Sequence, residues 1–301
     1  MCGQELLQRR AVHSVVDMPL HRFDARTFAH QLPPLPPGLI DPFLGVDAFD
    51  MPHHFFLPHP HGGMSAVTLM LDDSPGGVIN RDSQGDHSTI APGDLHWTQA
   101  GSGIVHEETP SNPGQSARGL QIFVNMARAR KQDPAAVFKT DRAAMPVWQG
   151  EGARLKVAAG SYVGPNITLS APISADARWA TPVNLWAIEL DAHAHLDLTV
   201  PDAHNAFAIV THGTLSVGDD AAQAPQTVLM SPALVGAPSS SVVSLQAGEG
   251  GAQLVWFSGA PLREPVVPHG PFVGNTRDDI VAYINAFQSG AMGELPASFT
   301  R

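Results

Sequence analysis

Short apolar segments that end in glycine- and proline-rich turns are the feature that most limits how this chain can fold. The 301 residues include 28 glycines and 27 prolines, which interrupt long helices and suit tight turns between strands. Apolar, partly β-branched residues fill positions 66–71, and the turn-forming stretch 72–77 separates them from the apolar pair 78–79. Two further short strands are expected at 95–98 and 104–106. This alternation of short strands and tight turns predicts an all-β fold.

The second half of the chain repeats this pattern of strands and turns. Apolar or alternating segments at 185–190, 196–200 and 206–211 lead through His212-Gly213 into a further strand. The more polar stretch 128–148 is typical of a connector, with a short helical turn near 133–136. We therefore predict a duplicated β-barrel, with an N-terminal barrel over residues 1–140 that holds the functional site and a C-terminal barrel over residues 141–301.

One helix is expected close to the C-terminus. Asn275 or Thr276 can cap it, and Asp278 and Asp279 suit the positive end of its dipole. Gly290 can end it. We expect the helix to pack on a barrel through an apolar stripe and assign it no chemistry; the stripe comprises Ile280, Tyr283, Ile284 and Phe287.

Charge and cysteine content limit the classes of partner. With 17 basic and 28 acidic residues the formal charge is −11, so the chain lacks the cationic surface that direct nucleic-acid binding requires. The one cysteine, Cys2, cannot form an internal disulfide, which suits a reducing compartment. No export leader and no apolar run of about 18 residues is evident. We expect a cytoplasmic protein that is not bound to a membrane.

Four side chains with a spacing of two predict a metal site. His59 and His61 form one pair, and His106 and Glu108 form another. Side chains at i and i+2 of a strand project from the same face, so each pair can point into a barrel. Three imidazoles and a carboxylate suit a divalent ion such as iron, nickel, copper, zinc or manganese, and leave coordination positions open for substrate or oxygen.

Other residues near these pairs could take the same role. His96 follows Gly93 with the spacing by which His106 follows Gly103, so spacing alone could nominate either histidine as the third ligand. Glu107 must point away from Glu108 on a strand, and we expect it to be solvated or salt-bridged. His53 and His54 are expected to be solvated loop residues, or to line the mouth of the site.

A second histidine group lies in the second half of the chain. We do not expect a second metal there. The group comprises His193, His195, His204 and His212.

Several motifs together resemble the pirin family of the cupin superfamily, over about residues 41–288. They are His59-Pro60-His61-Gly62-Gly63, Asn80-Arg81-Asp82-Ser83, Pro92-Gly93-Asp94 with Trp97, the segment 100–108, Gly119-Leu120-Gln121 and the segment 269–276.

The resemblance implies a bicupin, that is, two antiparallel β-barrels of the jelly-roll type with a C-terminal helix. It also implies one metal ion, most commonly iron as Fe(II), with nickel, copper, manganese, cobalt or zinc as alternatives, in the first barrel and none in the second. The ligands that the family pattern implies are His59, His61, His106 and Glu108, which favours His106 over His96.

The chain departs from the family pattern close to the site. Pirins commonly have Arg and Glu where this chain has Gly62 and Ser65, and His or Glu where it has Asn80. These positions are not ligands, so the departures concern substrate choice and partner contacts.

Two kinds of function follow from the resemblance. The first is a metal-dependent dioxygenase that acts with O2 on quercetin-like flavonols or on another enolisable metabolite. In this hypothesis Glu108 is also the catalytic residue, because it can accept the proton of the substrate hydroxyl. The alternative is a non-enzymatic, iron-dependent redox sensor that binds a transcription factor or a metabolic enzyme, for which the metal's oxidation state alters affinity for the protein partner.

Overall fold

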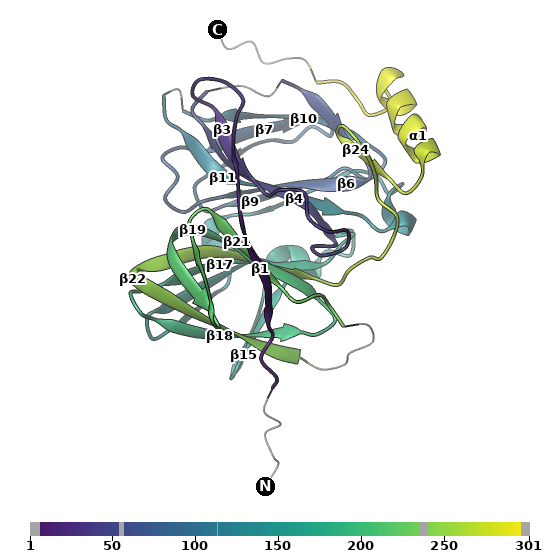
Figure 1. Ribbon diagram of the computed structural model, residues 1–301. Helices are drawn as coiled ribbons and strands as arrows, with labels where there is room; N and C mark the ends of the chain where they lie inside the picture. The colour runs from purple at the N-terminus through teal and green to yellow at the C-terminus, as the bar shows by residue number, and fades with distance from the viewer. Residues whose placement is uncertain (1–6, 54–56, 113, 235–239, 296–301) are drawn as a thin grey trace.

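Strands form most of the computed structural model, which describes residues 7–53, 57–112, 114–234 and 240–295. Within these ranges there is one α-helix, α1 (Arg277–Gln288), and the strands form two stacked barrels (Figure 1). The predicted all-β bicupin class is confirmed. None of the helices in the described ranges is long and apolar enough to cross a membrane. Cys2 and His54 lie outside the described residues.

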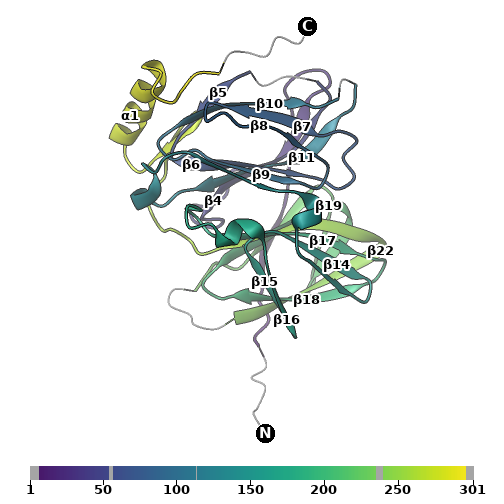
Figure 2. The same ribbon diagram turned by 180° about the vertical axis from the view of Figure 1, so that it is seen from behind.

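The first barrel consists of a seven-stranded and a four-stranded sheet, seen from behind as two layers in Figure 2. In spatial order the seven-stranded sheet contains β12 (Ala136–Thr140), β9 (Leu95–Gln99), β6 (Met64–Met70), β11 (Ala117–Asn125), β4 (Phe43–Met51), β3 (Phe28–Gln31) and β2 (Leu20–Arg22). The four-stranded sheet contains β5 (His59–His61), β10 (Ile104–Pro110), β7 (Val78–Asp82) and β8 (His87–Ile90).

A single nine-stranded sheet forms the second barrel. Its main path is β1 (Val12–Asp17), β21 (Gln226–Met230), β19 (Asn205–Val217), β22 (Ser240–Gly259), β17 (Val183–Leu190), β14 (Ala153–Ala159) and β13 (Val147–Gly150). Off this path, β18 (His195–Pro201) pairs with β22 and β20 (Asp220–Gln223) pairs with β19. The first half of β22 pairs with β18 and its second half with β17, so this long strand turns a corner of the barrel.

The remaining elements are short. They are the hairpins β15 (Ser161–Gly164) with β16 (Ile167–Ser170) and β23 (Val267–His269) with β24 (Phe272–Gly274), and the 3-10 turns 128–130, 142–144 and 172–175.

Two local predictions differ from the structure. His212-Gly213 does not separate two strands, because β19 continues through it with irregular pairing, and Gly213 takes a φ of 72° there. The helical turns of the connector lie at 128–130 and 142–144, and Ala136 already begins a strand that pairs with β9. Pairing with a strand far away in the sequence overrides the local helical preference.

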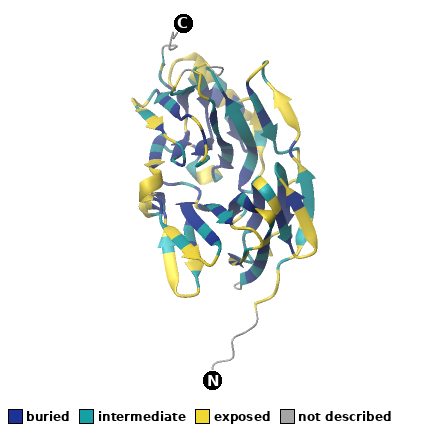
Figure 3. Ribbon diagram, turned by 90° about the vertical axis from the view of Figure 1, so that its left-hand side faces the viewer, coloured by how far each residue is buried: buried dark blue, intermediate teal, exposed yellow. Residues whose placement is uncertain are grey.

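The two barrels share one apolar core. Strands of the seven-stranded sheet place alternate residues on its two faces, and Val67, Trp97 and Leu120 belong to the face that joins the core of the second barrel. Trp97 packs edge-on against Trp179, with ring centroids 5.4 Å apart. Figure 3 shows buried positions along the strands of both barrels and exposed ones at hairpin ends. The opposite face of the same sheet is left to line the interior of the first barrel.

Each end of the chain packs on the barrel formed by the other half. Strand β1 pairs with β21 in the second barrel, and α1 lies beside the first barrel (Figure 1). Thr276 caps α1 in a capping box with Asp279, and Ile280 and Tyr283 pack with Val105 of β10. The predicted boundary at residue 140 therefore does not hold for the two ends of the chain. The N-terminal strand belongs to the second barrel, and the C-terminal helix packs on the first.

A buried lysine fixes the C-terminal segment to the first barrel. Lys131 Nζ donates to the Gly63 carbonyl oxygen at 2.6 Å, to Asn125 Oδ1 at 2.6 Å and to the Val273 carbonyl oxygen at 3.1 Å. Burial lowers the pKa of Lys131 to about 8, against the attraction of nearby carboxylates. All three donor positions of the ammonium are used, so the residue joins β6, β11 and β24.

Replacement of this lysine should weaken the whole fold. We expect Lys131→Met to lower the free energy of unfolding by about 3 kcal/mol, because the change leaves buried acceptors without a charged donor. Urea denaturation measures the effect. The control is Lys139→Met, whose half-exposed ammonium pairs with Asp86 and should contribute less than about 1 kcal/mol. Equal losses in the two variants would contradict the role assigned to Lys131.

Candidate metal centre

The register between β5 and β10 brings the three predicted histidines together. His106 lies directly opposite His59, and Ile104 lies opposite His61. Pro60 pairs with Val105 on the other face, which packs towards α1. The period-2 prediction is correct in its geometry, because His59, His61 and His106 all face the same interior.

The three imidazole rings form a compact triangle. Their centroids lie 4.9 Å apart for His59 and His61, 4.7 Å for His59 and His106, and 4.9 Å for His61 and His106. One nitrogen from each ring lies within 4.8 Å of the others. Neighbouring nitrogen ligands of one ion are about 3.0–3.4 Å apart, so the three rings would have to move together by about 1 Å or more to bind one metal.

The protonation states of the rings suit metal binding. Burial lowers the pKa of His61 to about 3 and that of His106 well below its usual value, and the neighbouring imidazoles add to both effects. His59 Nδ1 donates to the Leu57 carbonyl oxygen at 2.9 Å, because that oxygen can only accept, which leaves Nε2 as the nitrogen available to a metal. His61 and His106 are therefore neutral at physiological pH.

Unpartnered nitrogens mark the centre as a ligand site. Both ring nitrogens of His106 and Nδ1 of His61 are buried without a hydrogen-bond partner. Buried polar atoms are almost always satisfied in folded proteins, and a metal ion would satisfy these nitrogens. The residues present thus fit a divalent ion with imidazole ligands.

Glu108 lines the same cavity but is held by a different partner. Its two carboxylate oxygens lie 2.8 and 2.9 Å from Thr68 Oγ1, the hydroxyl that donates to them. Burial raises the pKa of Glu108, against the opposing influence of His96 and Thr68. The carboxylate is on the inner face of β10, as the spacing predicts.

The cavity around these residues has a volume of about 190 Å³. The apolar part of its wall includes Phe23, Ala29, Phe49, Met51 and Phe123, and its polar part includes the three histidines, Glu108, Gln121, Asp47 and Gln31. A small, mostly apolar chamber with convergent polar groups is the usual form of a site for a small molecule.

A polar row crosses the inner face of the seven-stranded sheet, and sequence reasoning missed it. In register from β9 to β3 it contains His96, Thr68, Gln121, Asp47 and Gln31. Gln121 Oε1 lies 3.4 Å from Thr68 Oγ1, and Gln31 Nε2 donates to Asp47 Oδ2 at 3.2 Å. The available signal was a lone polar residue within an apolar strand, as at Thr68.

His96 is the competing histidine, and both of its nitrogens have partners. Nε2 donates to Asp86 Oδ2 at 3.3 Å, and Nδ1 accepts from Thr98 Oγ1 at 3.4 Å. The ring is buried within β9, which lies between β12 and β6 in the sheet. His106, in contrast, has both nitrogens unpartnered.

The other predicted alternatives lie away from the histidine triangle. Glu107 is fully buried and pairs with Arg81 at 2.5 Å, so it is salt-bridged but not solvated. His53 is partly exposed and its Nε2 lies 2.8 Å from Asp24 Oδ2. Among the described residues, the one group that could hold a metal is the histidine triangle; it includes none of His193, His195, His204 and His212.

The C-terminal helix explains why glycine replaces the family's arginine next to His61. A Cβ at Gly62 would lie 2.7 Å from Tyr283 Cδ1 and 3.2 Å from Phe272 Cδ1. The aromatic pair fills the space that a long side chain would need. Gly62 therefore admits close packing of α1 and β24 against this part of the first barrel.

The fold and the histidine triangle define the class: a bicupin with a candidate metal centre in its first barrel. The pirin profile matches residues 36–124, and the profile of the pirin C-terminal cupin domain matches residues 185–293. The chain belongs to the pirin family.

Individual relatives agree with this assignment. The chain is 34% identical over 244 residues to a Pseudomonas aeruginosa protein named as a candidate quercetin 2,3-dioxygenase, with 77% of each chain covered. It is 30% identical to rat pirin, over 85% of this chain and 84% of that protein. The crystal structure of a quercetin 2,3-dioxygenase from Acinetobacter baumannii superposes with a TM-score of 0.80 at 25% identity, over 95% of this chain and 99% of that one.

Metal content distinguishes the two competing histidines. We expect His106→Ala to weaken metal affinity by more than about 100-fold. The loss of a group that only hydrogen-bonds to a metal ligand already weakens metal affinity by about 10- to 100-fold, and the loss of a ligand should cost more. His96→Ala should retain stoichiometric metal. Elemental analysis after dialysis gives the metal content, and thermal unfolding checks that both variants fold. Metal loss from His96→Ala with retention by His106→Ala would contradict the assignment.

Proposed function

We propose that the protein is a metal-dependent dioxygenase that acts with O2 on an enolisable small molecule, with quercetin-like flavonols as the first substrates to test. The observation that supports it best is the triangle of three imidazoles, with unpartnered nitrogens at His61 and His106, beside a buried carboxylate. The likeness to quercetin 2,3-dioxygenases supports the same chemistry.

In this proposal His59, His61, His106 and Glu108 hold one divalent ion. Iron as Fe(II) is the first choice, and nickel, copper, manganese, cobalt and zinc suit the same donors. When bound, the ion supplies Lewis acidity to a substrate hydroxyl and open positions for substrate and oxygen. Because burial keeps His61 and His106 neutral, binding does not have to displace a proton from an imidazolium at these two positions.

Glu108 has a second role in the proposal, as the group that accepts the proton of the substrate hydroxyl. Burial raises the proton affinity of its carboxylate, which suits a base that must accept a proton near neutral pH. The Thr68 hydroxyl lies within 2.9 Å of both oxygens and fixes their orientation. The carboxylate of Glu108 can thus bind the metal ion and accept the proton without moving.

The remaining cavity walls orient the substrate and exclude water. Phe49 and Phe123 offer apolar surface for a planar ring system. Gln121 Nε2 donates to the Val67 carbonyl oxygen at 3.2 Å, which fixes the amide at the cavity wall. The enolisable ring of a substrate held between these walls would present its hydroxyl to Glu108.

Oxygen uptake tests the proposed activity. Anaerobically iron-loaded protein should consume O2 and bleach the flavonol absorption band when quercetin is added. His106→Ala, treated in the same way, is the blank. No uptake by protein shown to contain iron would contradict the dioxygenase proposal and favour the redox-sensor hypothesis.

The role of Glu108 has a separate test. Glu108→Gln should retain part of its metal but lose about 10²- to 10⁴-fold in kcat, because the amide cannot accept the proton. The matched control is Glu249→Gln, on the exposed part of β22. Steady-state turnover and metal analysis of the same samples separate the two roles. Normal turnover by Glu108→Gln would contradict the proton-transfer role.

A further inference from the structure

We propose that the groove between the two barrels binds an apolar tail of the substrate, whose enolisable head lies in the metal cavity. This inference rests on the proposed function, because it extends the same site. It identifies the substrate class as a 3-hydroxy-4-oxo heterocycle, or a similar enol, that has an extended apolar substituent.

The sizes of the two spaces lead to this inference. The metal cavity holds about 190 Å³, whereas sites that enclose a drug-sized ligand hold about 300–1,000 Å³. The groove beside it has a volume of about 1130 Å³. A metabolite larger than one small ring system therefore cannot be enclosed by the metal cavity alone.

Gln31 and Asp47 are the two residues that line both spaces. On β4 the metal cavity is lined by Asp47, Phe49 and Met51, and the groove by Gly45 and Asp47, so the groove continues along the same strand. The partition is a pair of side chains joined by one hydrogen bond of 3.2 Å, from Gln31 Nε2 to Asp47 Oδ2. Rotation of the Gln31 side chain would open a path between head and tail sites.

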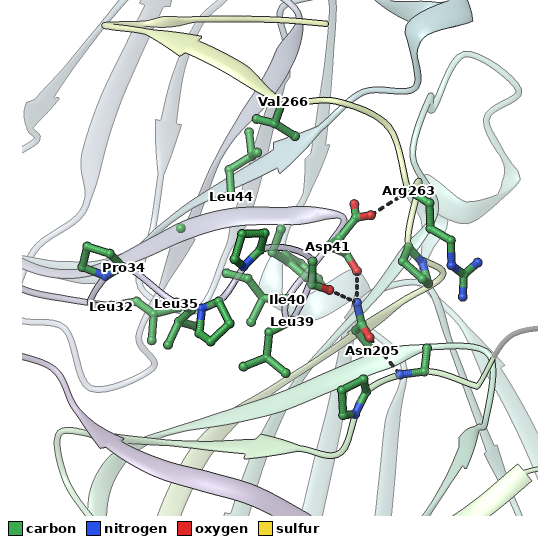
Figure 4. A pocket seen from close by; sticks show the side chains of 18 of the residues that line it. Leu32, Pro34, Leu35, Leu39, Ile40, Asp41, Leu44, Asn205, Arg263 and Val266 are labelled. Carbon is green, nitrogen blue, oxygen red and sulfur yellow. Dashed lines mark hydrogen bonds between the residues drawn. The ribbon is translucent and has the colours of Figure 1, made fainter.

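The lining of the groove suits an apolar tail. Figure 4 shows apolar side chains from the segment 32–40, from β4 and from the segment 261–266 gathered in one place. The proline-rich segment 33–37 forms one wall, and its rigid rings limit the loss of entropy on binding. Apolar chains bind to such surfaces in proportion to the area removed from water. The labelled members include Leu32, Leu35, Ile40, Leu44 and Val266.

Hydrogen bonds across the barrels hold the groove in shape. Asn205 Nδ2 donates to the carbonyl oxygens of Gly38 and Asp41, both at 2.8 Å. The Arg263 backbone N–H donates to Asp41 Oδ2 at 2.7 Å, as drawn in Figure 4. Both walls are thus fixed before a ligand arrives, which is the condition for a preformed binding site.

The experiment compares two probes with one head and different tails. They are 3-hydroxychromones with a methyl or a heptyl chain at carbon 2, and their Kd values for nickel-loaded wild-type protein are measured by calorimetry without oxygen. We expect the heptyl compound to bind about 100-fold more tightly, because most of its additional methylenes enter the groove.

Three variants locate the tail. Val266→Trp narrows the groove at an exposed position, and Gln31→Trp blocks the partition. Each should reduce the heptyl preference at least tenfold, and Val266→Trp, which lies outside the metal cavity, should leave the methyl compound's Kd within about twofold. Val281→Trp is the matched control, since Val281 is also exposed, on α1, and lines neither space.

The outcomes separate this inference from the proposed function. If the methyl compound binds but the heptyl preference is absent, or survives unchanged in Val266→Trp and Gln31→Trp, the groove inference is overturned and the head site stands. An equal loss of preference in Val281→Trp would also overturn it. If neither chromone binds to metal-loaded protein, both the proposed function and the groove inference fail.

Discussion

The antiparallel pairing of β5 with β10 is the contact on which the rest of the site depends. It places His59 opposite His106 and fixes His61 next to them, although 42 residues of sequence separate the two strands. A shift of one residue would turn the histidines away from the cavity. The outer side of this strand pair is covered by Phe272, Ile280 and Tyr283, and Lys131 holds that cover in place. The C-terminal helix therefore supports the register of a site to which it contributes no ligand.

The interior of the first barrel is unusually polar for a closed β-structure. The seven-stranded sheet buries apolar side chains against the second barrel, while its inner face holds the row from His96 to Gln31. Burying such groups costs free energy unless they are paired, and here Thr68 pairs with Glu108 and Gln31 pairs with Asp47. The three histidines are the exception, with unpartnered nitrogens at His61 and His106. This contrast points to a ligand rather than to packing as their purpose.

Period-2 spacing and family resemblance predicted the histidine triangle, and the short strands between turns predicted the all-β class. Capping preference limited the start of the last helix to Asn275 or Thr276, of which Thr276 is the cap. The inner polar row could not be predicted, because it depends on the register between strands distant in sequence, such as β6 with β11. Burial of Glu107 was missed for a related reason: the strand pattern gives its face, but only the pairing of β10 with β7 places Arg81 opposite it. Nothing in the local sequence predicts that β1 joins the second barrel or that α1 packs on the first.

Anomalous diffraction at the absorption edge of the bound metal tests the central claim most directly. Crystals of iron- or nickel-loaded protein should show one strong anomalous peak in the first barrel, within about 2.0–2.2 Å of nitrogens from His59, His61 and His106. Glu108 should lie at a similar distance through one oxygen. A peak bound to fewer than two of these histidines, or centred on His96 and Asp86, would contradict the account.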